Sequence, residues 1–108
     1  MANCQHSFVS VFMEVIGFYL LEDFARIHNQ SHKGLESWLK TARTNTWHNL
    51  FDVKKIYASA DGGVKGEYTV FNIAGNKYRL ITTINYVDQT IVVNHVFSHA
   101  QYDRWNKK

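Results

Sequence analysis

The sequence predicts an α+β fold, with helices in the first half of the chain and strands in the second half. Apolar residues recur at helical spacing between residues 18 and 57. Runs rich in β-branched and aromatic residues then flank a Gly-Asn turn signal between residues 68 and 86, and another such run covers 90–98. Because short turns connect these runs, we expect a mainly antiparallel sheet, with two N-terminal helices packed on it and a short C-terminal helix.

The first residues have the weakest pattern. We expect residues 1–12 to be a disordered N-terminal extension or the product of an upstream start site, and Met13 to be the natural start. Residues 13–108 then form a single domain, since 108 residues suffice for one core and not for two. The segment 11–16 predicts a first strand, which Gly17 ends.

Three helical segments follow. Leu20, Phe24 and Ile27 define the apolar side of the first helix, which starts at Phe18. Ser31 is the expected N-cap of a second helix that ends near Arg43. A third, shorter helical segment lies within 47–57 and is capped by Asn49, and the residues 61–63 predict a flexible loop. The apolar sides of the last two helices are formed by Leu35, Trp38, Leu39 and Ala42, and by Leu50, Val53 and Tyr57.

The strongest local signal is a β-hairpin over residues 68–86, with its turn at Ala74-Gly75-Asn76. In its second strand the even-numbered residues from Tyr78 to Tyr86 form a mostly apolar face. The opposite face consists of Lys77, Arg79, Ile81, Thr83 and Asn85. The strand 90–98 extends the hairpin, and a short helix is expected to begin at His99.

Charge and cysteine content limit the possible functions. The net charge is +3, and residues 54–108 carry 8 basic and 4 acidic side chains, against 4 basic and 5 acidic in residues 1–53. A basic, β-rich half is compatible with a polyanionic partner, and equally with a mildly basic surface. Cys4 is the only cysteine, which excludes an internal disulfide and fits a reducing, cytoplasmic compartment. The apolar stretch 8–21 is too short and interrupted to span a membrane.

One group of side chains has the composition of a phosphodiester-cleaving site. Lys77 and Arg79 lie two apart on one strand, and His99 and Tyr102 follow the neighbouring strand. A guanidinium matches phosphate oxygens, an imidazole transfers protons at neutral pH, and a phenol can position or protonate. The alternative is a surface of solvated charges with a histidine at a helix N-cap.

Further candidates are weaker. Lys54 and Lys55 are candidate phosphate-binding residues, and Trp105 could stack a base, although a solvated helix face and a packing role are the alternatives. The six histidines lack the spacing of a zinc site, so we expect no metal and no cofactor. His95 and His99 lie on one side of a strand and its end, but far apart along it.

Two motifs in the C-terminal half resemble a known family. V-F-N-I-A-G-N-K-Y-R-L-I at 70–81 and S-H-A-Q-Y-D at 98–103 resemble the HigB-type toxins of bacterial toxin–antitoxin pairs, within the RelE-like superfamily. Earlier segments agree, including Trp38, Trp47 and the D-V-K sequence at 52–54, so that the resemblance covers residues 13–105. Two positions differ from the family pattern: Asn94 replaces a frequent Arg or Lys, and Ser98 replaces Thr.

The resemblance implies a RelE-like fold and a metal-independent endoribonuclease that cuts messenger RNA on the ribosome and so inhibits translation. It also implies a cognate helix-turn-helix antitoxin of the HigA type. Carried over, Arg79 binds the phosphate with help from Lys77, and His99 and Tyr102 are the acid–base and positioning residues. The candidate substrate-binding residues are Lys54, Lys55, Asn76 and Asn94, although a turn-forming role is favoured for Asn76 and Asn72.

Two alternative functions remain open on the sequence. The loss of a cation at Asn94 is compatible with a catalytically weak module that only binds RNA or the antitoxin. A metal-dependent enzyme that uses the histidines is the third hypothesis, and it would be sensitive to EDTA.

Overall fold

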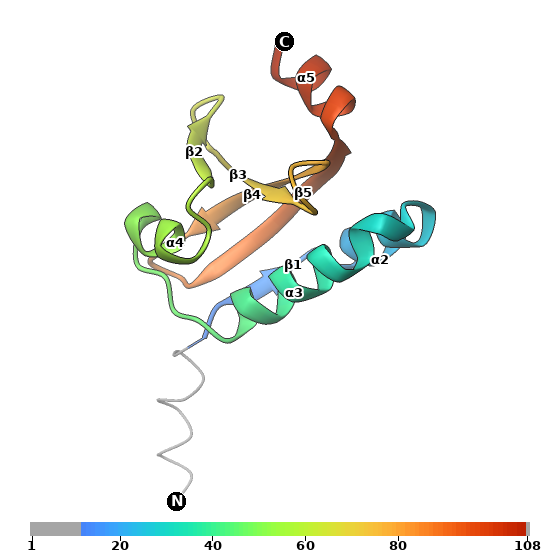
Figure 1. Cartoon of the computed structure of the whole chain (residues 1–108). Helices are drawn as coiled ribbons and strands as arrows, with labels where there is room; N and C mark the ends of the chain where they lie inside the picture. The colour runs from blue at the N-terminus through green and yellow to red at the C-terminus, as the bar shows by residue number, and fades with distance from the viewer. Residues whose placement is uncertain (1–11, 108) are drawn as a thin grey trace, which may run out of the picture.

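The structure is a computed structural model that describes residues 12–107. A five-stranded sheet forms its centre, with α2 and α3 side by side against one face (Figure 1). In spatial order the strands are β1 (Glu14–Ile16), β5 (Thr90–Ser98), β4 (Tyr78–Asn85), β3 (Tyr68–Ile73) and β2 (Asp61–Val64). β1 pairs with β5 in parallel, and the other neighbours are antiparallel, so the sheet is mixed. The predicted α+β class and antiparallel hairpin are confirmed.

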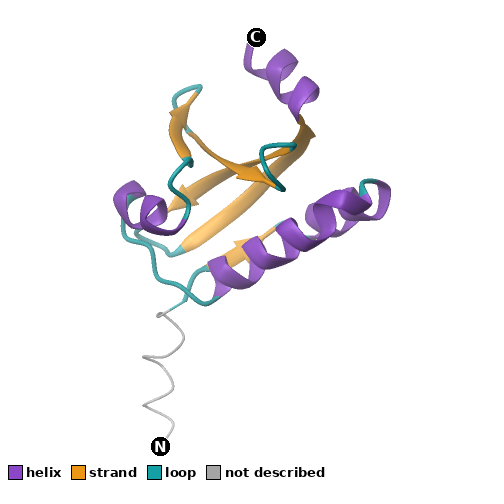
Figure 2. Cartoon of the chain, viewed as in Figure 1, coloured by secondary structure: helices purple, strands orange, loops and turns teal. Residues whose placement is uncertain are grey.

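The described residues contain four α-helices and one short 3-10 helix (Figure 2). They are α2 (Tyr19–Ile27), η1 (Asn29–Ser31), α3 (His32–Arg43), α4 (Leu50–Ile56) and α5 (His99–Lys107). In Figure 1, α5 and β2 rise from the side of the sheet opposite to α2 and α3. The two N-terminal helices and the C-terminal helix were predicted from the sequence. Most of the predicted extension, and Cys4 and Val11 with it, lies outside the described residues.

Several local predictions were wrong. Residues 61–63 are not a loop, since Asp61 and Val64 pair with Val70 and Tyr68 across a register shift. Ser31 does not cap α3, because it has helical backbone angles and its hydroxyl donates a hydrogen bond to the carbonyl of His28 at 2.7 Å. Ile27 was predicted on the apolar side of the first helix, but it is 79% exposed. The fully buried residues of α2 are instead Leu21 and Ala25.

The main core lies between the sheet and the helices. Trp38 of α3 packs edge-on against Phe71 of β3, with ring centroids 5.3 Å apart, and Trp47 stacks on Phe71 from the end of the sheet near α4. The apolar spacing predicted for α3 and α4 is confirmed, because Leu35, Trp38, Ala42 and Val53 are all buried. Burial of aromatic side chains of this size provides much of the stability of a domain of this length.

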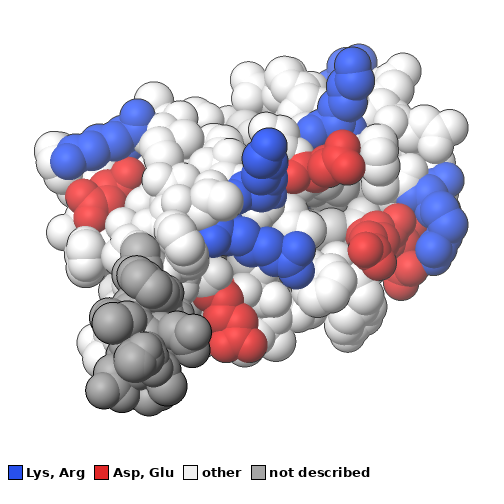
Figure 3. All heavy atoms as spheres, turned by 90° about the horizontal axis from the view of Figure 1, so that it is seen from below, with Lys and Arg blue, Asp and Glu red and all other residues white. Residues whose placement is uncertain are grey.

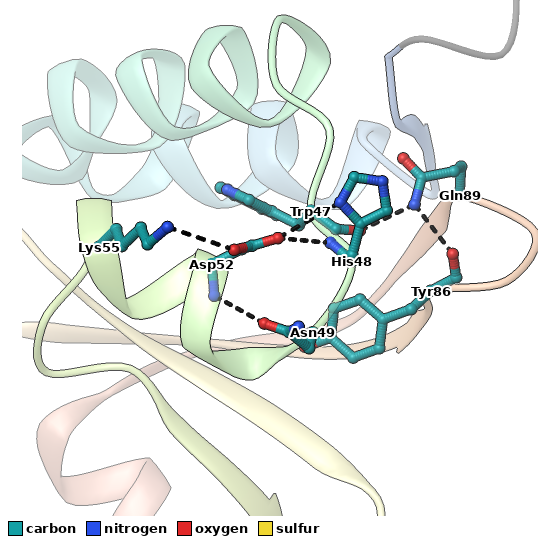
Figure 4. A network of polar contacts seen from close by, with 7 residues as sticks. All are labelled: Trp47, His48, Asn49, Asp52, Lys55, Tyr86 and Gln89. Atoms are coloured by element: carbon teal, nitrogen blue, oxygen red, sulfur yellow. Dashed lines mark hydrogen bonds and ion pairs between the residues drawn. The ribbon is translucent and has the colours of Figure 1, made fainter.

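A network of polar contacts joins α4 to the turn between β4 and β5 (Figure 4). The predicted cap is confirmed: the side chain of Asn49 accepts a hydrogen bond from the backbone of Asp52 at 2.9 Å. Asp52 in turn accepts one from the backbone of His48 at 3.0 Å. The amide of Gln89 donates to the carbonyls of Trp47 and Tyr86, at 2.8 and 2.9 Å. This network fixes the end of the sheet that lies away from the C-terminal helix.

Candidate functional site

The side of the sheet away from α2 and α3 carries the candidate site, and we call it the open face. Strand pairing defines it, because directly paired residues point to the same side. Arg79 of β4 pairs with Asn72 of β3 and with Phe97 of β5. The next row of the open face consists of Val70, Ile81 and His95. Val70 and Ile81 are buried but lie outside the main core, so the open face has a small apolar layer of its own.

Arg79 is held in place by the hairpin that it belongs to. Its guanidinium donates to the carbonyl of Asn76 at 2.7 Å and more weakly to that of Tyr78 at 3.3 Å. Asn76 has a φ of +71°, and this turn conformation lets its carbonyl accept that hydrogen bond beside the strand. Arg79 is only partly buried, so the rest of its donor fork remains available to a ligand.

Tyr102 of α5 lies against Arg79. The guanidinium carbon is 5.7 Å from the centroid of the Tyr102 ring, which is a cation–π contact. Burial raises the pKa of the Tyr102 phenol, and the negative charges of Asp61 and Asp103 raise it further, while Arg79 lowers it. The phenol therefore stays protonated at neutral pH, as a proton donor requires. The structure thus brings together two of the four residues predicted for the catalytic group.

The side chains of His99 and Lys77, the other two predicted residues, contact other parts of the molecule. His99 begins α5, and its Nδ1 is 3.3 Å from the carboxylate of Asp103 on a largely exposed side of the helix. The ammonium of Lys77 donates to the side chain of Gln30 in η1 at 3.1 Å. Within residues 12–107, no hydrogen bond or ion pair joins either residue to Arg79 or Tyr102. Their predicted roles remain predictions.

The predicted substrate-binding residues are dispersed. Lys54 donates to the carbonyl of Ala60 at 3.1 Å, and Lys55 lies 3.7 Å from Asp52 and over the ring of Phe51. Asn94 occupies the register shift between β4 and β5, where its amide donates to Thr83 at 3.3 Å and to the carbonyl of Val92 at 3.2 Å. Asn72 is not a turn residue, since it lies in β3 and donates to the hydroxyl of Ser59 at 3.2 Å.

Sequence reasoning missed an aromatic cluster beside Arg79 on the open face. The His95 ring stacks on Phe97, with centroids 4.9 Å apart and an interplanar angle of 12°. Trp105 of α5 packs against both of them and against Tyr68 and Tyr102, and the ammonium of Lys65 lies 5.0 Å from the Trp105 ring. All five aromatic side chains are only partly buried. The two-residue spacing of His95 and Phe97 was visible in the sequence, but the pairing of Phe97 with Arg79 was not.

The helical side of the molecule differs in chemistry. Seen from below, Lys and Arg side chains alternate with Asp and Glu, and neither sign dominates (Figure 3). Leu21, Ala25, Leu35 and Leu39 line a groove of about 660 Å³ between α2 and α3, on the far side of the sheet from Arg79. In the part of the chain that the structure describes, no three His, Cys, Asp or Glu side chains are placed to hold a metal ion.

The chain matches the model of a known protein family over residues 31–105. That family is HigB_toxin, described as the RelE-like toxic component of a toxin–antitoxin system. This chain belongs to the HigB toxin family. The match includes α3, the whole hairpin and all of the candidate site, and it confirms the resemblance noted in the sequence.

A curated relative supports the same family. The chain is 24% identical over 93 residues to the mRNA interferase HigB of Escherichia coli O6:H1 (strain CFT073). The alignment covers 85% of this chain and 90% of the relative, so the two sequences correspond over most of their length. Among residues 12–107, no helix of this HigB toxin is both long and apolar enough to cross a membrane.

Proposed function

We propose that this chain is an endoribonuclease that cleaves messenger RNA on the ribosome and thereby inhibits translation. The observation that carries the proposal is the contact between Arg79 and Tyr102 on the open face, at 5.7 Å. A cation that can bind phosphate and a protonated phenol occupy one site, beside partly exposed aromatic side chains that suit unpaired bases.

The proposed reaction is transfer of an RNA phosphodiester to its own 2′-hydroxyl. The 2′-oxygen loses its proton to a base and bonds to phosphorus, the bond to the 5′-oxygen breaks, and that oxygen takes a proton from an acid. Arg79 stabilises the charge that develops on the phosphate oxygens. Tyr102 is the acid, because its phenol remains protonated at neutral pH. The products are a 2′,3′-cyclic phosphate and a 5′-hydroxyl.

The charge of the transition state is met here by a guanidinium, so the mechanism needs no metal ion. A tyrosine and an imidazole can supply the two proton transfers, and the guanidinium only stabilises the charge. The name of the E. coli relative, an mRNA interferase, supports messenger RNA as the substrate. Because the proposed substrate is messenger RNA on the ribosome, we expect the toxin to act in the cytoplasm.

The family description supports an antitoxin as partner, and we propose a helix-turn-helix protein of the HigA type. Such a partner would silence the nuclease by covering the open face or by blocking access to the ribosome. Lys77 is retained as a proposed aid to phosphate binding by Arg79, and His99 as a proposed acid–base or positioning residue at the edge of the site.

Mapping RNA ends in induced cells tests the proposed function. Wild-type protein is expected to stop growth and to create new messenger RNA ends within translated regions, and Arg79→Ala is expected to create few. Protein stripped with EDTA and returned to ribosomes in magnesium buffer should cleave as before. A growth arrest without new ends would instead indicate a module that binds and stalls without cutting.

A further inference from the structure

The reaction needs a base for the 2′-hydroxyl, and two histidines lie near the C-terminal end of the sheet. His99 was the one singled out by sequence. It begins α5, its side chain is 59% exposed, and its Nδ1 is oriented towards Asp103 on the same helix at 3.3 Å. These contacts do not direct it towards Arg79.

His95 lies on the open face beside Arg79. Arg79 pairs directly with Phe97, and His95 precedes Phe97 by two residues on the same side of β5. Diagonal neighbours of this kind on adjacent strands are about 7–8 Å apart at the backbone, which is within reach of long side chains on one phosphate group. Ile81, the direct partner of His95, is buried and apolar, and the strand register puts His95 on the same side of the sheet as Arg79.

The surroundings of His95 fix its ring and leave its nitrogens available. The ring stacks on Phe97 at 4.9 Å and meets the edge of Trp105 at 5.9 Å. Among the ion pairs of residues 12–107, none involves His95. Aromatic contacts thus orient the imidazole, and it is partly exposed to solvent.

We propose that His95 is the base that takes the proton of the attacking 2′-hydroxyl. This assignment rests on the proposed endoribonuclease function. The proton passes from the 2′-hydroxyl to a neutral nitrogen of His95 as the new oxygen–phosphorus bond forms. Tyr102 gives its phenolic proton to the departing 5′-oxygen, and Arg79 stabilises the phosphate charge. The imidazolium of His95 then returns a proton to the tyrosinate through water, which restores both residues.

Single-turnover cleavage of messenger RNA on purified ribosomes tests the assignment. His95→Phe keeps the stacking on Phe97 and Trp105 but has no nitrogen, so the cleavage rate should fall at least about 100-fold with ribosome binding unchanged. His99→Gln should lower the cleavage rate much less. His32→Gln, which removes an exposed imidazole on α3, is the matched control and should cleave as the wild type does.

A second variant separates catalysis from packing. His95→Ala leaves a gap beside the Phe97 and Trp105 rings in which free imidazole can stack, so added imidazole should restore part of the lost rate. Thermal unfolding of each variant checks its fold. A fully active His95→Phe protein, or a His95→Ala protein that folds but is not rescued, would overturn the assignment. If the wild type itself made no cuts, the proposed function would fail instead.

Discussion

The guanidinium of Arg79 lies over the ring of Tyr102, although the two residues belong to β4 and α5 and are far apart in the sequence. None of the residues of α5 is fully buried, so the helix is held on the sheet by partly buried aromatic contacts. The contact therefore has two roles. It orients the guanidinium, and it holds the phenol at the open face.

Replacement of Arg79 is expected to separate charge from geometry. Arg79→Ala should lower the cleavage rate by about 10²–10³-fold, because it removes the group that meets the transition-state charge. The cleavage rate of Arg79→Lys should lie between those of the wild type and Arg79→Ala, since an ammonium keeps the charge but not the planar fork. Cleavage rates and growth after induction measure the effect. Equal activity of the lysine variant and the wild type would contradict bidentate binding of the phosphate.

Replacement of Tyr102 tests the acid. Tyr102→Phe keeps the ring beneath Arg79 and should lower the rate by about 10²–10⁴-fold without loss of RNA binding. Burial, Asp61 and Asp103 raise the pKa of the phenol from 10.0, so the loss of wild-type activity that follows deprotonation of this phenol should lie at a pH above that value. Asp61→Asn removes one of these charges, lowers the pKa and should move the alkaline limit to lower pH. An alkaline limit that is unchanged in Asp61→Asn would remove Tyr102 from this role.

The close approach of α3 to the β3–β4 turn should be sensitive to one methyl group. A Cβ at Gly34 would lie 2.7 Å from a methyl of Ile73 and 3.3 Å from the backbone nitrogen of Ala74. Alanine gains about 1 kcal/mol in helix propensity, but overlap of this kind typically costs about 1–3 kcal/mol. We expect Gly34→Ala to be destabilised by about 1 kcal/mol in urea unfolding, whereas the exposed Ser37→Ala should change little. A stabilised Gly34→Ala protein would show that the contact is loose.

The cap of α4 should contribute to stability independently of function. Asn49→Ala removes the acceptor for the Asp52 backbone and is expected to lower the free energy of unfolding by about 1 kcal/mol. Asn49→Ser should keep most of the stability of the wild type, because serine is also a good N-cap residue. Both variants should still arrest growth, because α4 lies away from the open face. Equal stability of the alanine and serine variants would indicate that the side-chain hydrogen bond contributes little.

Much of the fold could be predicted because its signals are local. The hairpin follows from β-branched runs around Ala74-Gly75-Asn76, where Ala74, Gly75 and Asn76 do adopt positive φ. The N-cap role of Asn49 could be predicted because asparagine is a preferred residue at the start of a helix. β2 was missed because Asp-Gly-Gly has low strand propensity and is held in the sheet by only two pairs, Asp61 with Val70 and Val64 with Tyr68.

The candidate site was only partly predictable because its contacts are long-range. Alternation placed Lys77 and Arg79 on one side, yet Lys77 binds Gln30, which lies 47 residues earlier. His95 gains its importance from the register that places Phe97 opposite Arg79. Neither contact follows from a spacing within one strand. The two motifs identified the family, but tertiary packing decides which side chains meet.

A double-mutant cycle in single-turnover cleavage tests the central claim most directly, namely that Arg79 and Tyr102 act on one phosphodiester. If they share a transition state, Arg79→Ala and Tyr102→Phe should each be severely impaired, and the double variant should lose far less than the product of the two effects. Full activity in either single variant, or losses that simply multiply, would contradict a shared site.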